Sequence, residues 1–146
     1  MDDTYPVLLK KGVAAYLDVL GIGIYKSTGA YTPEETITLP GIVTSGEVPT
    51  TFDNCIVLST MRPVFTGRAD IETPIQVFAR RRGTRSDIEN FSETILNALN
   101  DKSHMVLNEL PISFIQYRNG LIFERDTQGR YASNQTFYFR GRKPSH

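Results

Sequence analysis

The sequence has one cysteine, two histidines, no tryptophan and no excess of charge of either sign. Because Cys55 is the only cysteine, the chain holds neither a disulfide framework nor a cysteine zinc site. Its 16 basic and 16 acidic residues give a formal net charge of zero, which argues against a domain that coats nucleic acid generally. No apolar run approaches the about 20 residues of a membrane span, and the acidic start lacks a signal-peptide layout. We therefore expect a protein without membrane contact that is made and stays in a cytoplasm, or in something assembled there.

Side chains that could act together as acid, base and nucleophile are scarce. His146 is the last residue, and His104 sits in a polar stretch that is typical of an exposed linker. Cys55 begins an apolar run, where a cysteine usually serves as a small core residue. No zinc-ligand spacing, nucleophile elbow or phosphate-binding loop is present. The sequence thus predicts no catalytic residue, no metal site and no cofactor.

The length and composition suit a single domain spanning residues 1–146. Its fold class is predicted as α+β: a mostly antiparallel sheet of four to six strands, with two main helices packed on one face and one long extended loop. The expected helices are 6–20 and 86–99. The expected strands are a short one at 22–25 and longer ones at 55–61, 73–82, 112–117, 121–124 and 131–140, with a loop at 29–54 and a loose tail at 141–146.

Two local signals fix details of this prediction. Ser86, followed three residues later by Glu89, has the spacing of a capping box and predicts the start of the second helix. Asn119-Gly120 is typical of a two-residue hairpin turn and predicts that two strands meet there.

Four arginines gather between the strand 73–82 and the second helix: Arg80, Arg81, Arg82 and Arg85. They would suit DNA phosphate or an acidic partner, or they form a solvated strand end that pairs with Asp87 or Glu89. The sequence leaves both interpretations open. Later basic residues would extend the cluster into a patch if the sheet brought them together: Arg125, Arg130, Arg140, Arg142 and Lys143.

A family resemblance lies in the last two thirds of the chain. The strand Thr73–Arg80 leads into a helix, and the turn Asp126-Thr127-Gln128-Gly129-Arg130 precedes an aromatic strand that begins Tyr131-Ala132-Ser133-Asn134. This order and this turn resemble the tail terminator, or tail completion, proteins of long-tailed bacteriophages, which are often described as minor capsid proteins. The resemblance covers about 70% of the chain and leaves out the loop at 29–54.

The resemblance implies a virion protein of the tail–head junction, assembled in the host cytoplasm. Such proteins form a ring, expected to be a hexamer, on the last tail-tube ring; they stop tube growth and meet the head connector while DNA passes through without sequence recognition. The expected partners are therefore further copies of the chain, the tail-tube protein and the connector or neck protein. The loop and the turn would supply interface residues, and the arginines would face a neighbour or the DNA channel. The interface set is Thr44, Ser45, Glu47, Val48, Thr50, Phe52, Asp53, Asp126, Gly129 and Arg130.

Three alternatives stay open at this point. A head-completion or neck protein of the same particle would look similar in sequence. A small nucleic-acid-binding module would use the arginines for phosphates and aromatic side chains as stacking platforms, namely Tyr117, Phe123, Tyr131, Phe137 and Phe139. An enzyme is the remaining reading, for which no coupled acid, base and nucleophile is found.

Overall fold

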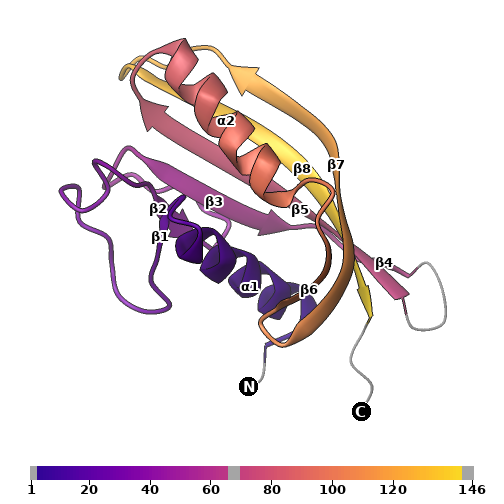
Figure 1. Cartoon of the computed structure of the whole chain (residues 1–146). Coiled ribbons are helices and arrows are strands. Elements are labelled where there is room, and N and C mark those ends of the chain that lie inside the picture. The colour runs from indigo at the N-terminus through magenta and orange to yellow at the C-terminus, as the bar shows by residue number, and fades with distance from the viewer. Residues whose placement is uncertain (1–2, 66–69, 143–146) are drawn as a thin grey trace.

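A computed structural model describes residues 3–65 and 70–142 of the chain. In this part of the molecule there are two helices and eight strands (Figure 1). In chain order they are α1 (Tyr5–Val19), β1 (Ile24–Tyr25), β2 (Gly41–Val43), β3 (Cys55–Thr60), β4 (Val64–Phe65), β5 (Asp70–Arg82), α2 (Arg85–Leu99), β6 (Ser103–Leu107), β7 (Leu110–Phe123) and β8 (Arg130–Arg142).

All eight strands belong to one curled sheet in the order β1-β2-β3-β5-β8-β7-β6, with β4 paired only to β5. The three long strands β5, β8 and β7 are antiparallel neighbours and form the centre of the sheet. At one side, β1, β2 and β3 run parallel to one another. The predicted α+β class and its two main helices therefore agree with the structure. The sheet has more strands than predicted, and although most of its pairings are antiparallel, the parallel pairing of β1, β2 and β3 makes it mixed.

Both helices pack on the same side of the curled sheet (Figure 1). Their buried faces meet alternate residues of the central strands, such as Ile75 and Val77 of β5 and Phe137 and Phe139 of β8, in one core. The period-2 alternation of these strands directs every second side chain to this face. Burial of large aliphatic and aromatic side chains of this kind supplies most of the driving force for folding.

The opposite side of the sheet carries no helix in the described residues. Over β2, β3 and β5 it is closed by a smaller apolar cluster, in which Phe52, Cys55 and Val57 are buried. Tyr31 and Phe52 pack ring to ring with centroids 5.3 Å apart. The segment predicted as the loop 29–54 therefore contains β2 and lies against the sheet as its cover on this side.

The hairpin prediction at Asn119-Gly120 is wrong. β7 continues through both residues to Phe123, and its register with β8 shifts between Tyr117 and Asn119. The irregularity is a β-bulge. Glycine occurs in bulges as well as in turns, so it is compatible with both. An added Cβ at Gly120 would lie 2.5 Å from the Tyr117 hydroxyl, so the absent side chain makes room for that tyrosine.

Two predicted element boundaries, the start of the second helix and the end of the last strand, also differ from the structure. The helix α2 begins one residue before Ser86, and its capping box joins Thr84 to Asp87: the Asp87 amide donates to the Thr84 hydroxyl at 3.2 Å, and the Thr84 amide donates to the Asp87 carboxylate at 2.8 Å. Asp87, two residues closer to the cap than Glu89, is at the third helical position and closes the box with its shorter side chain. At the C-terminus, Gly141 and Arg142 extend β8 rather than belonging to the predicted tail, and residues 143–146 lie outside the described part.

The two candidate caps differ in their expected effect on stability. Thr84→Ala should lower the free energy of unfolding by about 1 kcal/mol because it removes an N-cap hydrogen bond. Ser86→Ala, at an exposed position inside the first turn, is the matched control and should change it by less than about 0.5 kcal/mol. Urea denaturation of both variants measures the difference, and an equal loss in the two would contradict the assignment of the cap.

Candidate subunit interface

Arg80 holds the long loop against the helix-free side of the sheet. Its side chain leaves β5 on that side, and the residue is only 7% exposed. The Nε group donates to the Asp53 carbonyl at 2.9 Å, and Nη2 donates to the Pro49 and Phe52 carbonyls, each at 2.8 Å. Hydrogen bonds from a charged donor are stronger than neutral ones. The loop residues 49–53 are thereby fixed by backbone contacts.

This placement bears on the interpretation of the arginine cluster. Arg80 lies beneath the loop of its own subunit, so its guanidinium is not offered to a DNA phosphate or to a neighbouring chain. Arg81 is half-buried: its guanidinium stacks over the Phe91 ring at 4.8 Å and donates to the Thr38 carbonyl at 3.3 Å. Burial lowers the pKa of Arg81 from its ordinary value. Both side chains serve the fold of the subunit.

The loop and the β7–β8 turn meet in a chain of ion pairs. Asp53 accepts Arg82 Nε at 2.6 Å on one carboxylate oxygen and Arg130 Nη1 at 3.1 Å on the other. Arg130 Nε in turn contacts Asp126 at 2.8 Å. The structure thus brings together four residues that the sequence placed in two separate groups, because Arg82 and Arg130 are register partners on β5 and β8.

Hydrogen bonds hold the pKa values of both carboxyl groups in this chain below their usual range. For Asp53 the largest cause is the hydrogen bond from the Arg82 side chain. For Asp126 it is the backbone amide of Arg130, at 2.9 Å, and the amide of Gln128 donates to the same oxygen. This side-chain-to-backbone pattern is an Asx turn. Gly129 completes the turn with a φ of 77°, a conformation that favours glycine.

Arg85 and Arg82 are the exposed members of the cluster. Arg85 lies 3.5 Å from Glu89 and 3.9 Å from Glu124, and all three side chains are about half exposed or more. Pairs of this kind contribute little to stability, because water and salt screen them. The pairing of Arg85 with Glu89 is one that the sequence analysis named, whereas Asp87 is engaged in the helix cap.

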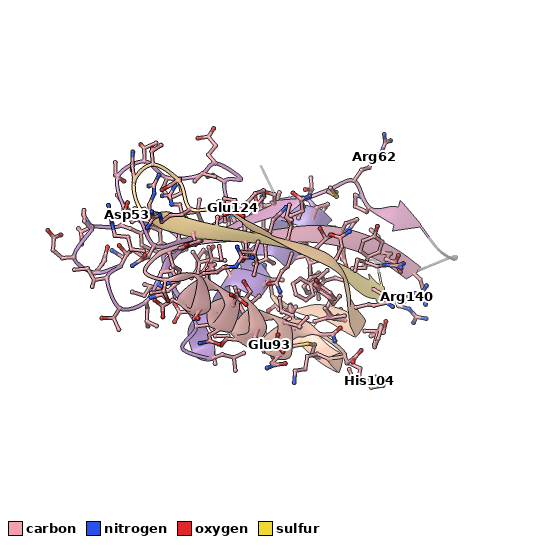
Figure 2. All side chains as sticks on the ribbon, turned by 90° about the horizontal axis from the view of Figure 1, so that it is seen from above. Asp53, Arg62, Glu93, His104, Glu124 and Arg140 are labelled. Carbon is pink, nitrogen blue, oxygen red and sulfur yellow. The ribbon has the colours of Figure 1, made fainter. Side chains whose placement is uncertain are left out.

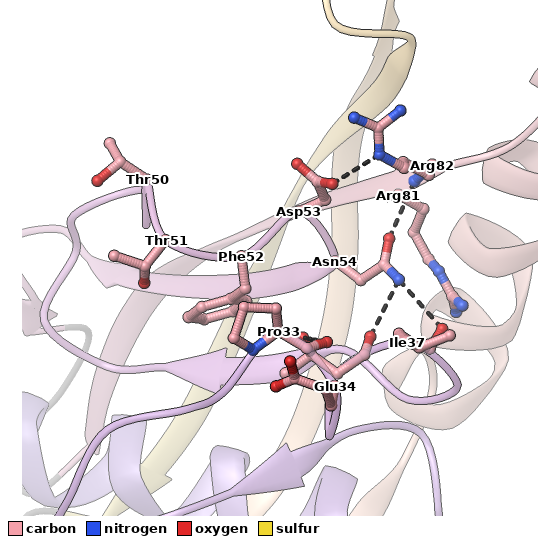
Figure 3. A pocket seen from close by; sticks show the side chains of 11 residues that line it. Pro33, Glu34, Ile37, Thr50, Thr51, Phe52, Asp53, Asn54, Arg81 and Arg82 are labelled. Carbon is pink, nitrogen blue, oxygen red and sulfur yellow. Dashed lines mark hydrogen bonds and ion pairs between the residues drawn. The ribbon is translucent and has the colours of Figure 1, made fainter.

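An open pocket of about 420 Å³ lies beside this ion-pair chain (Figure 3). The loop residues 50–54, the segment 33–37 and the last residues of β5 line it. Asn54 joins these three parts: its amide nitrogen donates to the Thr36 and Ile37 carbonyls, and its oxygen accepts the Arg82 amide. Sequence reasoning missed Asn54, because a lone asparagine in a polar loop carries no signal of three simultaneous contacts.

Most of the loop positions predicted as interface are accessible. Ser45, Glu47 and Thr50 are exposed, Thr44 is half-buried, and Val48 is 45% exposed although it is apolar. Ile37, which the sequence analysis did not single out, is 67% exposed. Phe52 is instead buried in the small apolar cluster, so it supports the loop from beneath.

Of the later basic residues in the described part, the sheet brings Arg130 to the arginine cluster but places Arg140 and Arg142 far from it. Arg130 pairs in register with Arg82 at one end of β5, and Arg142 pairs with Asp70 at the other. The 13 residues of β5 separate the two groups, a distance of about 40 Å in an extended strand. Figure 2 shows Arg140 at the opposite end of the molecule from Asp53 and Glu124. Lys143 lies outside the described residues.

The aromatic side chains considered as stacking platforms are divided between core and surface. Phe137 and Phe139 are fully buried, so neither can stack on a base. Tyr117 packs edge-on against Phe137 at 5.6 Å and is half-buried, as is Tyr131. Only Phe123 of the five is exposed. A nucleic-acid-binding surface built from this set is therefore not present in the subunit.

Cys55 and His104, the residues considered as candidates for catalysis, lie in different environments. Burial raises the pKa of the Cys55 thiol to about 11, and its sulfur sits in the small apolar cluster. His104 is exposed, as predicted, but it belongs to β6 rather than to a linker. Among the described residues no three His, Cys, Asp or Glu side chains converge on a point that would hold a metal ion. Neither helix in the described part has the length and apolar character needed to cross a membrane.

No family model and no curated protein matches the sequence. A similar fold occurs in a solved structure of the virion of a native gene transfer agent particle. One chain of that particle superposes on this one with a TM-score of 0.59 and 8% sequence identity, covering 96% of each chain. At this identity the likeness establishes a shared fold over nearly the whole length.

Replacing Arg80 should test its role under the loop. Arg80→Met keeps most of the volume but leaves three carbonyl groups without their charged donor, so the free energy of unfolding should fall by about 2–4 kcal/mol. Arg82→Met, at an exposed side chain of the same strand, is the matched control and should cost less than about 1 kcal/mol. Equal losses, measured by urea denaturation, would contradict the structural role of Arg80.

The ion-pair chain should also make stability depend on pH. Because the folded-state pKa values of Asp53 and Asp126 are depressed, their contribution is full above the ordinary carboxyl pKa, about 4, and is lost as pH falls through the lower folded values. The double variant Asp53→Asn with Asp126→Asn should therefore lose less stability than the wild type between neutral pH and about pH 3. Glu34→Gln removes an exposed loop carboxylate that forms no ion pair among the described residues, so this variant should retain the full decline. A fall in the free energy of unfolding that is as steep in the double variant as in the wild type would contradict this prediction.

Proposed function

We propose that this protein is a structural component of a phage-like virion and acts as a tail terminator. In this proposal, copies of the chain form a ring, most simply a hexamer, at the head-proximal end of the tail tube. The observation that carries it is the shared fold with a chain of a gene transfer agent virion over 96% of both chains. The resemblance of the turn at 126–130 and of the strand that follows it supports the same assignment.

The surfaces of the subunit suit assembly by docking. A ring requires head-to-tail contacts between two different patches that close by rotation. In this proposal the exposed part of the loop contacts a neighbouring ring, and the exposed apolar side chains of Val48 and Ile37 are part of that contact. Arg80 and the ion-pair chain through Asp53 hold this loop in one conformation, so little ordering entropy would be lost on binding.

The proposed ring would have the tail-tube protein on one axial face and the head connector on the other. Arg82 and Arg85 remain as candidates for an inter-subunit contact or for the channel lining, since their guanidinium groups are accessible. A channel through which DNA moves benefits from few cationic contacts, because phosphate contacts strengthen binding without sequence selection. Arg80 and Arg81 are not part of this proposal, since each is engaged within its own subunit.

Deletion of the gene in a particle-producing genome tests the proposed role. Tails should polymerise well beyond their normal length and remain unattached to heads, because no ring would cap the tube. Negative-stain electron microscopy measures tail length, and a plasmid copy of the wild-type gene should restore it. Tails of normal length beside unattached heads would instead indicate a head-completion or neck protein of the same particle.

A further inference from the structure

The second half of β7 is an open edge of the sheet. Residues 110–114 pair with β6, and the amides of Ile115 and Tyr117 donate to Lys102 and Asn100. From Arg118 to Phe123 the described part of the chain provides no strand on this side. Figure 1 shows this half of β7 as the outermost strand, running beside α2. The edge is about 20 Å long, enough to accept a strand of ordinary length.

The other two edges of the sheet are protected. β1 is only two residues long, and the Tyr25 amide donates to the Asp18 carboxylate at 2.9 Å. β6 contains His104 with a φ of 53°, which departs from strand geometry. Short strands, capped amides and irregular backbone are the devices that keep sheet edges from pairing. Beyond the bulge at Arg118, β7 has none of these features as far as Phe123, and Leu121 is 60% and Phe123 40% exposed.

A groove of about 290 Å³ accompanies this open edge, between α2 and β7. Its α2 wall carries Glu89 and Glu93, and Figure 2 shows Glu93 on that helix. Glu89 is 3.5 Å from Arg85, whereas no basic partner of Glu93 occurs among the described residues. The groove therefore has an acidic rim beside an unpaired backbone edge.

Polar side chains lie in the floor of the same groove. Ser92, Ser133 and Gln135 all line it and are at most 8% exposed. The two serine hydroxyls and the Gln135 carbonyl oxygen have no hydrogen-bond partner within the described protein. Buried polar atoms are nearly always hydrogen-bonded in folded proteins. Three such atoms in one groove are a second observation that points to a bound polar group.

We propose that this groove binds an extended peptide segment with basic side chains, which adds a strand to the open edge of β7. Strand addition pairs the unpaired backbone groups between Arg118 and Phe123. A basic side chain of the segment lies over Glu93, and apolar side chains on its other face contact Leu121 and Phe123. In a virion the segment belongs to a neighbouring subunit, and this identification alone rests on the proposed function.

The charge of the rim decides between occupants. A two-fold pairing of this edge with the same edge of a second copy would place two acidic rims together, and like charges oppose such pairing. DNA phosphate is opposed for the same reason. A basic extended segment can form hydrogen bonds with the unpaired backbone groups of β7 and ion pairs with the carboxylates of the rim.

Binding of model peptides to the intact protein tests this proposal. The probes are alternating valine–lysine and valine–glutamate peptides of about seven residues, together with a valine–lysine peptide N-methylated along one edge. The lysine peptide should bind with a Kd at least tenfold lower than the glutamate peptide and shift the amide resonances of Leu121 and Ile122. The N-methylated peptide keeps the charge but cannot pair on that edge, and should lose at least tenfold in affinity.

Variants assign the charge preference to the groove. Glu93→Lys should weaken binding of the lysine peptide, whereas Glu34→Lys makes the same charge change in a distant loop and should leave it unaltered. Failure of the lysine peptide to bind at millimolar concentration overturns the proposal, as does binding indifferent to N-methylation or to Glu93→Lys. A two-fold dimer that pairs this edge with the same edge of a second copy, seen by sedimentation velocity together with shifts of the Leu121 and Ile122 amide resonances, also overturns it. None of these outcomes depends on the tail-terminator role, which the deletion experiment tests separately.

Discussion

The buried guanidinium of Arg80 is the contact on which the non-helical side of this molecule depends. Both helices cover one side of the curled sheet, so part of the other side must be closed by the chain's own loop. A loop has many backbone polar groups and few apolar ones, and burying its carbonyls without donors is costly. Arg80 supplies donors to three of them at once, and Phe52 supplies the apolar contact. The loop then becomes a fixed surface rather than a free segment.

That constraint organises the surface around it. With the loop fixed, Asp53 reaches both Arg82 and Arg130, and the β7–β8 turn is tied to the end of β5 through Asp126. The outer positions of the loop remain exposed, and so does the open half of β7 beside α2. The subunit thus presents two different surfaces, a braced loop and an unpaired strand edge.

The sequence predicted the elements that have strong local signals. The strand predicted at 73–82, with its period-2 alternation, begins three residues earlier in the structure and ends where predicted, and the amphipathic second helix was located within one residue. The predictions failed where a second segment decides the outcome: Asn119-Gly120 has the same composition in a turn and in a bulge, and only the pairing of β7 with β8 distinguishes them. For the same reason the four clustered arginines looked alike in sequence, although Arg80 is buried and Arg82, two residues further along the same face of the strand, is exposed. Asp53 and Arg130 were named in one interface set, but their direct contact required the register of β5 with β8.

The central claim is that this protein works by fitting its surfaces against other subunits at the junction of tail and head. Cryo-electron microscopy of the intact particle at side-chain resolution tests it most directly. We expect a ring of this chain between the last tube ring and the connector, with the loop 44–53 against a neighbouring ring. A particle whose head–tail axis contains no copy of the chain would contradict this account.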